Sequence, residues 1–306
     1  MVIQNILSIF KKKPIKILVL VGGNKTKIEE FIPAASELQL DVTTASFSEL
    51  VYDSFSSNFT LKIGEVDLKE FTHIYIRMVG MRLEDATLVA NYAKKNRIKI
   101  FDPLYKDSLL MPSSLGKSVE MMKIISKDAG LPKTIFGSLE HLKNVAEKHL
   151  GFPFVIKSTT GKKAREVWSP ETKKDMKVLF GKLSELEKEG SRFFAQEFIN
   201  ASERVRVFVL GDRALAAIVR PTKWRKRLGS EGRKMVMSPI PEEYSEIAVK
   251  AAKACGLIIS GVDVVKDEKT GRLYILEANA APVWKALSHD TGVNIEKEIL
   301  SYISKQ

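Results

Sequence analysis

Residues 261–279, GVDVVKDEKTGRLYILEAN, predict two adjacent β-strands joined by a tight turn. Two apolar runs flank the polar segment DEKTG at 267–271, the pattern of a β-hairpin. If the strands pair antiparallel, Asp263 can lie opposite Glu277, and Glu277 and Asn279 project from one face because they are two residues apart. Carboxylates and an amide that converge in an apolar setting are costly unless a cation lies between them. Their oxygen atoms suit Mg²⁺, so the hairpin is a candidate magnesium site.

Taken alone, these three residues also fit a simpler interpretation, in which strand-end carboxylates pair with lysines. An EF-hand is excluded, because the segment after Asp263 lacks alternating acidic ligands and the glycine that such a loop requires. The choice between a magnesium site and plain ion pairs therefore depends on what else in the chain handles anions.

A lysine ends the apolar run FPFVIK at 152–157, and a loop of small residues and lysines, STTGKK, follows at 158–163. The charge of Lys157 at the end of a buried strand is costly unless an anion awaits it or the side chain reaches the surface. The loop contains Gly161 and could cover phosphates with backbone amides, although it lacks the GxxxxGK[ST] pattern of a Walker A loop. Together with the hairpin, this segment is a candidate phosphate site.

Two arginines lie on apolar strands that follow one another in the chain. Arg206 belongs to RVRVFVL at 204–210, and Arg220 ends AAIVR at 216–220, after a turn at Gly211-Asp212. Both could face one cleft, where their permanently charged forks suit a phosphate or an acyl-phosphate. For either arginine alone, a surface position on a sheet edge is the simpler hypothesis.

The rest of the chain alternates strand-like and helix-like patterns. Residues 14–112 predict a small open α/β domain, in which the run KILVLV at 16–21 is a buried parallel strand. Residues 116–129 predict an amphipathic helix with Val119, Met122, Ile125 and Ala129 on its apolar face. Strands are predicted at 16–21, 41–45, 73–77, 98–101, 134–136, 154–157, 193–199, 205–210, 214–219, 261–266 and 273–278, and helices at 27–38, 83–96, 116–129, 139–150, 170–189, 242–255 and 294–304.

The composition bounds the class of protein. With 306 residues, 44% of them hydrophobic and 28% charged, the chain has the balance of a soluble globular protein with more than one domain. Its longest apolar runs are strand-sized, and its first residues lack the charge order and cleavage site of a secretory signal. Cys255 is the single cysteine, which excludes an intrachain disulfide and favours a reducing compartment. We therefore expect a cytoplasmic protein with no membrane partner.

The net charge of +12 is unevenly distributed. One stretch, 223–234, holds Lys223, Arg225, Lys226, Arg227, Arg233 and Lys234. It predicts either a solvated loop or a loop that attracts anions, and we expect it to attract an acidic substrate. Trp224 is its single aromatic residue, so a base-stacking surface for nucleic acid is not expected.

In their order along the chain, these motifs resemble those of ATP-grasp enzymes. Within that superfamily they are most similar to the RimK-like group, which adds amino acids such as glutamate to a carboxylate of a protein or small molecule. The motifs that carry the resemblance are Lys157, QEFI at 196–199, Arg206, Arg220, GVD at 261–263, EANAAP at 277–282 and TGVNI at 291–295. The resemblance covers about residues 100–306 and extends more loosely to the N-terminal domain.

The resemblance implies a role for each matched residue. The implied ATP-binding residues are Lys117 and Lys157 at the phosphates, Glu197, Phe198 and Ile199 at the adenine, and in addition Gly161 and Gln196. The implied metal ligands are Asp263, Glu277 and Asn279, which would hold two Mg²⁺ ions, with Mn²⁺ as a substitute. The implied catalytic residues are Arg206 and Arg220, which would stabilise the phosphoryl group and the acyl-phosphate.

The resemblance also implies a mixed α/β and α+β architecture. An N-terminal open α/β domain, the pre-ATP-grasp domain at 1–112, would precede a two-lobed ATP-grasp fold. Its central lobe would comprise 113–192, and its C-terminal lobe, with the metal site, 193–306. The implied reaction joins an amine or amino acid to an acidic carboxylate acceptor with release of ADP, in a protein that commonly forms homo-oligomers.

Three departures from the family pattern bear on the substrate. The loop after Lys157 has few glycines, and the family's asparagine before the last sheet is replaced within 225–229. The position two before Arg206, often aspartate in the family, is Arg204 here, so the neighbouring Glu203 is the candidate for the nucleotide contact. Two other functions stay open: an ATP-grasp kinase that phosphorylates a small molecule without ligation, and a nucleotide-dependent binding or scaffold protein.

Overall fold

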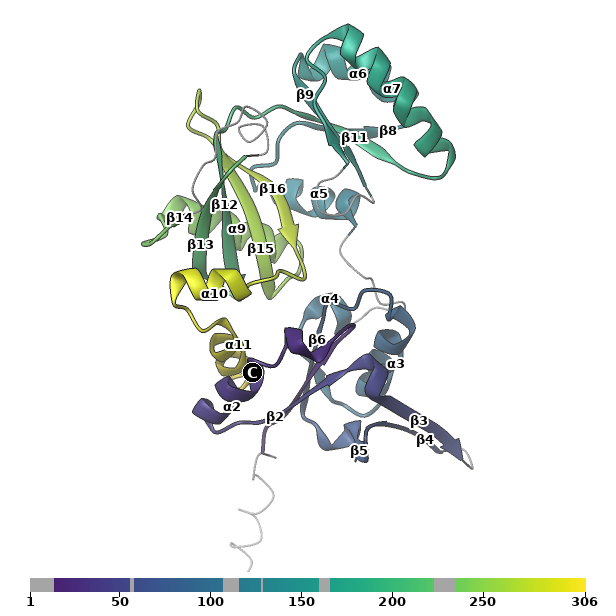
Figure 1. Cartoon of the computed structure of the whole chain (residues 1–306), viewed down its shortest axis with the longest axis vertical. Helices are drawn as coiled ribbons and strands as arrows, with labels where there is room; N and C mark the ends of the chain where they lie inside the picture. The colour runs from purple at the N-terminus through teal and green to yellow at the C-terminus, as the bar shows by residue number, and fades with distance from the viewer. Residues whose placement is uncertain (1–13, 56–57, 107–115, 128, 160–165, 223–234) are drawn as a thin grey trace, which may run out of the picture. The chain divides into compact units, whose positions relative to one another are not determined.

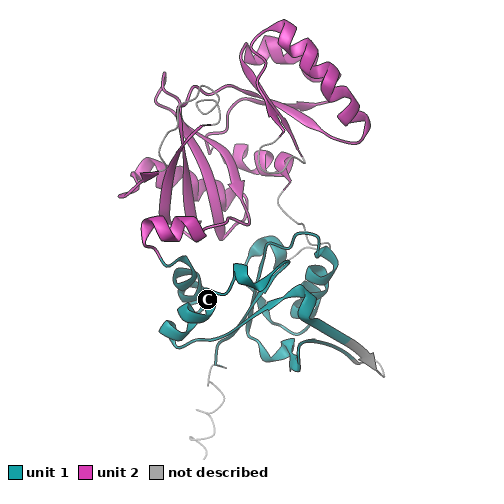
Figure 2. Ribbon diagram, viewed as in Figure 1, with its two compact units in different colours: residues 1–113, 294–306 teal, residues 114–293 magenta. Residues whose placement is uncertain are grey.

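The computed structural model describes residues 14–55, 58–106, 116–127, 129–159, 166–222 and 235–306. The chain forms two compact units: unit 1 comprises 1–113 and 294–306, and unit 2 comprises 114–293 (Figure 2). Across the described segments, every helix is too short or too polar to cross a bilayer.

Unit 1 is built on a four-stranded parallel sheet with the order β2-β1-β6-β7 (Figure 1). Its strands are β1 (Lys16–Val21), β2 (Asp41–Ser46), β6 (His73–Arg77) and β7 (Lys99–Ile100). Its helices are α2 (Phe31–Leu38), α3 (Leu83–Lys95) and α4 (Pro103–Lys106), with short 3-10 helices η1 (Lys25–Lys27), η2 (Phe47–Glu49) and η3 (Leu68–Glu70). The side chains from Ile17 to Val21 are fully buried, as expected for a central parallel strand covered on both faces. The open α/β arrangement predicted for this part of the chain is present.

A second, antiparallel sheet in unit 1 was not predicted. It comprises β3 (Leu50–Phe55), β4 (Asn58–Ile63) and β5 (Val66–Asp67), and Figure 1 shows β3 and β4 extending as an arm from the parallel sheet. Leu61 anchors this sheet in the core of unit 1. Val51 and Tyr52 are both exposed, so the alternation that signals a half-buried strand is broken in β3.

The segment 294–306 belongs to unit 1, although the sequence analysis placed it in the C-terminal lobe. Its helix α11 (Ile295–Ile303) packs against α2 and buries Ile295, Ile299, Leu300 and Ile303 completely. Lys297 also forms an ion pair with Glu37 of α2 at 2.8 Å. The apolar side chains of α11 are thus buried against α2 rather than against the sheet that precedes the helix in the chain. The expected division between 113–192 and 193–306 stays a prediction.

One half of unit 2 is a four-stranded sheet with the order β10-β9-β11-β8, covered on one face by two helices (Figure 1). Its strands are β8 (Thr134–Gly137), β9 (Phe154–Ser158), β10 (Val167–Trp168) and β11 (Phe193–Glu197), and its helices are α6 (Leu139–Leu150) and α7 (Lys173–Lys188). Phe154 and Ile156 point into the core beneath the helices. Since neighbouring residues of a strand face opposite ways, Val155 and Lys157 point to the uncovered face.

The other half of unit 2 is a five-stranded antiparallel sheet with the order β14-β13-β12-β15-β16. Its strands are β12 (Glu203–Leu210), β13 (Arg213–Pro221), β14 (Met235–Val236), β15 (Ile259–Lys266) and β16 (Leu273–Asn279). Helix α9 (Glu242–Ala254) packs against β12, β15 and β16, and α10 (Lys285–Thr291) contacts β13. In this arrangement β16 is an edge strand.

Helix α5 (Lys117–Ile125) also belongs to unit 2, and its predicted apolar face was wrong. The structure buries Glu120, Met121 and Ile124, whereas Val119, Met122 and Ile125 are 42%, 61% and 63% exposed. At roughly 100° per residue, the buried side therefore lies nearly opposite the predicted one. This orientation directs a carboxylate, Glu120, toward the edge of β16, where it accepts a backbone hydrogen bond.

Candidate active site

A cavity of about 610 Å³ lies within unit 2, between its two sheets and beside α5. It collects most of the side chains singled out in the sequence. The predicted residues that line it are Lys117, Lys157, Gln196, Glu197, Phe198, Ile199, Arg206, Asp263, Glu277 and Asn279. Arg204, noted as a departure from the family pattern, also lines it.

Three predicted site residues are not among the described lining residues of the cavity. Gly161 lies outside the described segments. Glu203 is exposed on β12 and is out of phase with Arg204 and Arg206, which share the face toward the cavity. Arg220 pairs with Arg204 across β12 and β13, so it shares that face but lies one strand further from Asp263.

The hairpin β15–β16 has the predicted pairing, with Asp263 opposite Glu277 and Gly261 opposite Asn279. A β-bulge follows Asp263, because Val264 pairs with Ile275 and leaves Leu276 unpaired on β16. Bulges bend a strand and turn its side chains, and they recur beside active sites. Here the bulge lies next to Glu277, the carboxylate nearest to α5.

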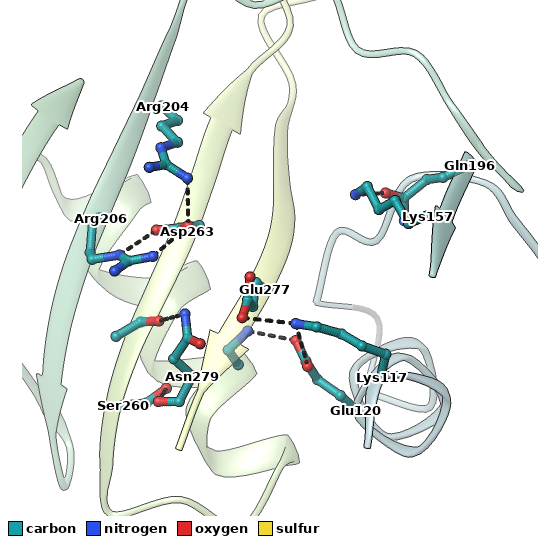
Figure 3. A network of polar contacts seen from close by, with 12 residues as sticks. Lys117, Glu120, Lys157, Gln196, Arg204, Arg206, Ser260, Asp263, Glu277 and Asn279 are labelled. Atoms are coloured by element: carbon teal, nitrogen blue, oxygen red, sulfur yellow. Dashed lines mark hydrogen bonds and ion pairs between the residues drawn. The ribbon is translucent and has the colours of Figure 1, made fainter. Parts of the chain in front are cut away.

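Asp263 is almost fully buried and is held by two arginines (Figure 3). Arg206 donates through Nε to Oδ1 at 2.7 Å and through Nη2 to Oδ2 at 2.8 Å, and Arg204 donates through Nη1 to Oδ2 at 3.1 Å. The bond to Asp263 raises the pKa of Arg206 above its usual value. Burial, followed by repulsion from Arg206 and Arg204, lowers the pKa of Arg220. Two guanidinium groups therefore bond to one carboxylate, with Arg220 one strand further along the same face, and this surplus of positive charge favours an anionic ligand.

Glu277 is held by a lysine from another element. Lys117, at the start of α5, places Nζ 2.8 Å from Oε1 of Glu277 and 3.3 Å from Oε2 of Glu120 (Figure 3). Asn279 donates through Nδ2 to the carbonyl of Gly261 at 3.4 Å. The simpler interpretation of the triplet, a carboxylate paired with a lysine, thus describes Glu277 in this structure.

The oxygen atoms of Asp263, Glu277 and Asn279 fit magnesium when a bound anion supplies further ligands. Within the described residues, no group of three or more acidic, histidine or cysteine side chains could hold a metal alone. Asp263 and Glu277 each already hold a cationic side chain, and Mg²⁺ takes oxygen ligands from carboxylates together with phosphates. A metal that arrived with a phosphate group would allow an exchange, since the carboxylates could turn to the metal and Arg206 and Lys117 to the phosphate.

Lys157 points from β9 into the cavity rather than to the surface. Its Nζ donates to Oε1 of Gln196 at 2.6 Å (Figure 3). The same nitrogen lies 5.8 Å from the centre of the Phe194 ring. Gln196 is fixed in turn, since its Nε2 donates to Oγ1 of Thr134 at 2.9 Å. Burial, followed by the charge of Lys117, lowers the pKa of Lys157 to about 8. The ammonium group is therefore short of negative partners and suited to receive one.

The end of β11 is tied to the chain segment before β8. The backbone nitrogen of Glu197 donates to the carbonyl of Lys133 at 2.9 Å, and Oε1 of Glu197 accepts from the backbone nitrogen of Lys133 at 2.9 Å. Phe198 and Ile199 follow along the wall of the cavity. This wall is apolar and has a fixed backbone, the features that a flat heterocycle requires.

One residue of this cluster was missed in the sequence. Glu120 bonds to Lys117 and to the backbone of β16, yet it lies outside every motif that carried the resemblance. A glutamate in the first turn of a helix ordinarily signals a favourable interaction with the helix dipole, so its sequence position gives no sign of burial.

Comparisons with known proteins match the part of the chain that holds this cavity. A family model described as the RimK-like ATP-grasp domain matches residues 117–303. A probable alpha-L-glutamate ligase 1 of Shewanella frigidimarina is 29% identical over 205 residues, which cover 65% of this chain and 66% of the relative. A probable alpha-L-glutamate ligase of Alkalilimnicola ehrlichii is 30% identical over 205 residues, with the same coverage. The chain thus spans just under two thirds of the length of these relatives.

Solved structures show the same fold over nearly the whole chain. The ATP-grasp ligase PsnB, complexed with a phosphomimetic variant of its minimal precursor, Mg and ADP, superposes with a TM-score of 0.73 at 15% identity. That match covers 96% of this chain and 99% of the other. The macrocyclase MdnC, bound with the precursor peptide MdnA from Microcystis aeruginosa, gives a TM-score of 0.70 at 16% identity, covering 95% and 100%. At these identities the likeness establishes the fold.

Proposed function

Because this chain belongs to the RimK-like ATP-grasp family, we propose that it joins a carboxylate to an amine at the expense of ATP. The observation that carries the proposal is the cavity in which Asp263 and Glu277 each hold a cationic side chain while Lys157 approaches from the other sheet. Opposed sets of carboxylates and cations suit a metal–nucleotide complex, in which the carboxylates take the metal and the cations take the phosphates.

Members of the family use ATP and Mg²⁺, and the residues of this chain can be assigned to both. Lys117 and Lys157 bind the phosphates, and the wall formed by Glu197, Phe198 and Ile199 holds the adenine. Asp263, Glu277 and Asn279 hold the metal, for which we propose two Mg²⁺ ions, replaceable by Mn²⁺. When bound, the metal supplies charge neutralisation at the γ-phosphate.

The reaction proceeds in two balanced steps. A carboxylate oxygen of the acceptor attacks the γ-phosphorus, the bond to the β-phosphate oxygen breaks, and ADP leaves with that electron pair. The amine nitrogen then attacks the acyl carbon, phosphate leaves, and the nitrogen loses a proton. Arg206, at the edge of the cavity beside Asp263, neutralises charge on the transferred group and on the tetrahedral oxyanion. Arg220 adds positive charge to the same face of the sheet.

The proposed substrates are an amino acid as the amine and an acidic molecule or protein terminus as the acceptor. The relatives named as glutamate ligases support an amino acid, and the solved neighbours that hold precursor peptides support a peptide acceptor. The surplus of guanidinium charge around Asp263 supports an acidic one. The basic stretch at 223–234, which we expect to attract that acceptor, lies outside the described residues. Homo-oligomers and a cytoplasmic location remain predictions.

Release of ADP should require both substrates. We expect ADP from Mg²⁺, ATP, pooled amino acids and an acidic acceptor, little when either substrate is omitted, and none with Glu277→Ala. With an acceptor carboxylate labelled with heavy oxygen, one labelled atom should appear in the released phosphate, since an acyl-phosphate transfers that oxygen. Phosphorylated acceptor without phosphate release would favour a kinase, and ATP binding without turnover would favour a binding protein.

Nucleotide affinity should depend on pH through Lys157. Its pKa is lowered to about 8, so the cationic form that binds phosphate is present below pH 8 and is lost as the pH rises through that value. Affinity for Mg-ATP should be constant below pH 8 and weaken by about tenfold per pH unit above it. The ligand-free protein should instead gain stability between pH 8 and the ordinary lysine pKa near 10.4, where the unfolded chain binds the extra proton.

Calorimetric titration and thermal unfolding at a series of pH values would measure both trends. Lys157→Met should flatten both. A wild-type affinity that does not change from pH 7 to pH 9.5 would contradict the assignment of Lys157 to the phosphates.

A further inference from the structure

Glu120 is a buried carboxylate that the proposed reaction does not use. It lies in the first turn of α5 and is 2% exposed. Burial raises its pKa above the usual value, against the opposing effects of Lys117 and of a backbone hydrogen bond. A buried charge is retained at a cost, so its contacts indicate what it does.

The two oxygen atoms of Glu120 serve different elements. Oε1 accepts from the backbone nitrogen of Ala278 at 2.6 Å, and Oε2 lies 3.3 Å from Nζ of Lys117 (Figure 3). Ala278 stands between Glu277 and Asn279 on β16, and among the described strands none pairs with the outer edge of β16. The carboxylate thus occupies a hydrogen-bonding position that a further strand would fill, and it ties α5 to the segment that bears two candidate metal ligands.

Lys117 contacts two carboxylates, and these differ in how freely their side chains can move. Glu120 lies one helical turn away on the same helix, is nearly inaccessible, and is fixed by Ala278. The Glu277 side chain is 35% exposed in the cavity. If Glu277 turns to a metal, Lys117 loses its shorter ion pair but keeps the one to Glu120, so its ammonium group is not free to swing away.

We infer that Glu120 is a positioning residue, which holds the ammonium group of Lys117 at the phosphate side of the cavity after Glu277 has turned to the metal. This role rests on the proposed function, because it requires that Lys117 binds nucleotide. It goes beyond that function by assigning nucleotide affinity to a side chain that does not line the cavity.

A purely structural role for Glu120 makes a different prediction. If the carboxylate served just to cover the edge of β16 at Ala278, its loss would act equally whether or not Lys117 was present. If it acts through Lys117, its loss has no further effect once Lys117 is gone. A double-mutant cycle separates the two.

The experiment measures the dissociation constant of Mg-ATP by calorimetry in wild type, Glu120→Gln, Lys117→Met and the double variant. Glutamine can still accept from Ala278 but carries no charge for Lys117. We expect Glu120→Gln to weaken binding about tenfold, the effect of losing one hydrogen bond to a charged group. We expect the double variant to bind as Lys117→Met does. Glu187→Gln is the matched control, because Glu187 also accepts from a backbone nitrogen, that of Leu139 at 2.9 Å, and should bind as wild type does.

Each other outcome overturns a defined claim. Glu120→Gln with wild-type affinity, or a further loss in the double variant relative to Lys117→Met, overturns the positioning role. The comparison of the double variant with Lys117→Met can be made even if Glu120→Gln alone does not fold, because the double variant removes both charges of the pair. A wild-type protein that does not bind Mg-ATP overturns the proposed function and the role of Glu120 with it.

Discussion

Asp263→Asn should lower the ligation rate roughly a thousandfold, because it weakens a candidate metal ligand, and metal neutralisation contributes several kcal/mol to phosphoryl transfer. The same change should lower the free energy of unfolding by about 2–3 kcal/mol, because Asp263 accepts three hydrogen bonds from charged guanidinium groups. Asparagine has one acceptor oxygen and directs an amide donor toward Arg206 or Arg204. Activity and stability should therefore fall together, as measured by ADP release and by chemical denaturation.

Asp267→Asn is the matched control for this change. Asp267 lies at the turn of the same hairpin and accepts from the backbone of Lys269 and Thr270, outside the cavity. Asparagine can support the same turn, so activity should be retained. If Asp263→Asn turned over at the wild-type rate, Asp263 would not be a metal ligand, whatever its effect on stability.

Lys157→Met should weaken Mg-ATP binding roughly a hundredfold, the scale for removing one partner of a buried, hydrogen-bonded charge pair. Stability of the ligand-free protein should change little. Burial lowers the pKa of Lys157, which means that its charged form is costly in the folded protein. Removing that cost offsets the loss of the hydrogen bond to Gln196. Methionine also keeps an apolar stem near the Phe194 ring. Binding is then lost without destabilisation, the opposite of the pattern expected for Asp263→Asn.

Calorimetry and thermal unfolding of the same preparations would check both halves of this prediction. Lys173→Met provides the comparison, because Lys173 of α7 forms a surface ion pair with Glu147 of α6. That pair is exposed and should contribute little to stability and nothing to binding. Wild-type affinity in Lys157→Met would remove Lys157 from the phosphate site.

The parts of the fold that the sequence predicts are those with strong local patterns. The resemblance to RimK-like ATP-grasp enzymes and the mixed α/β fold class are confirmed by the family match and the solved structures. Strands β1 and β6 have the predicted ends, and the sheet buries every residue of both except Lys16, which is partly buried. Helix α6 also has its predicted ends, since Ser138 caps it by accepting from His141 and Gly151 follows with a positive φ.

The elements that the sequence did not predict depend on tertiary contacts. The arm of β3 and β4 lacks a clean alternation of buried and exposed side chains. The partner of α11 is decided by the apolar surface of α2, which lies far away in the chain. The buried side of α5 includes Glu120, which bonds to the backbone of Ala278, and hydrophobic periodicity does not place a glutamate on a buried face.

The sequence predicted the part of the candidate site that lies on the β15–β16 hairpin. The turn predicts the hairpin, but its register alone would pair Asp263 with Leu276, and the β-bulge shifts the partner to Glu277. Alternation along the strand then places Asn279 on the same face as Glu277. The partners of these carboxylates were not predictable in the same way. Arg204 was identified as a departure from the family pattern, but its bond to Asp263 depends on the register of β12 against β15.

The membership of α11 in unit 1 has a consequence for synthesis of the protein. The ribosome makes the sheet of unit 1 first, then all of unit 2, and then α11. Unit 2 can complete both of its sheets while unit 1 still lacks a helix, so the part that is begun first is finished last. During that interval the apolar surface of α2 that α11 covers is open to water and to chaperones, for as long as the translation of unit 2 lasts.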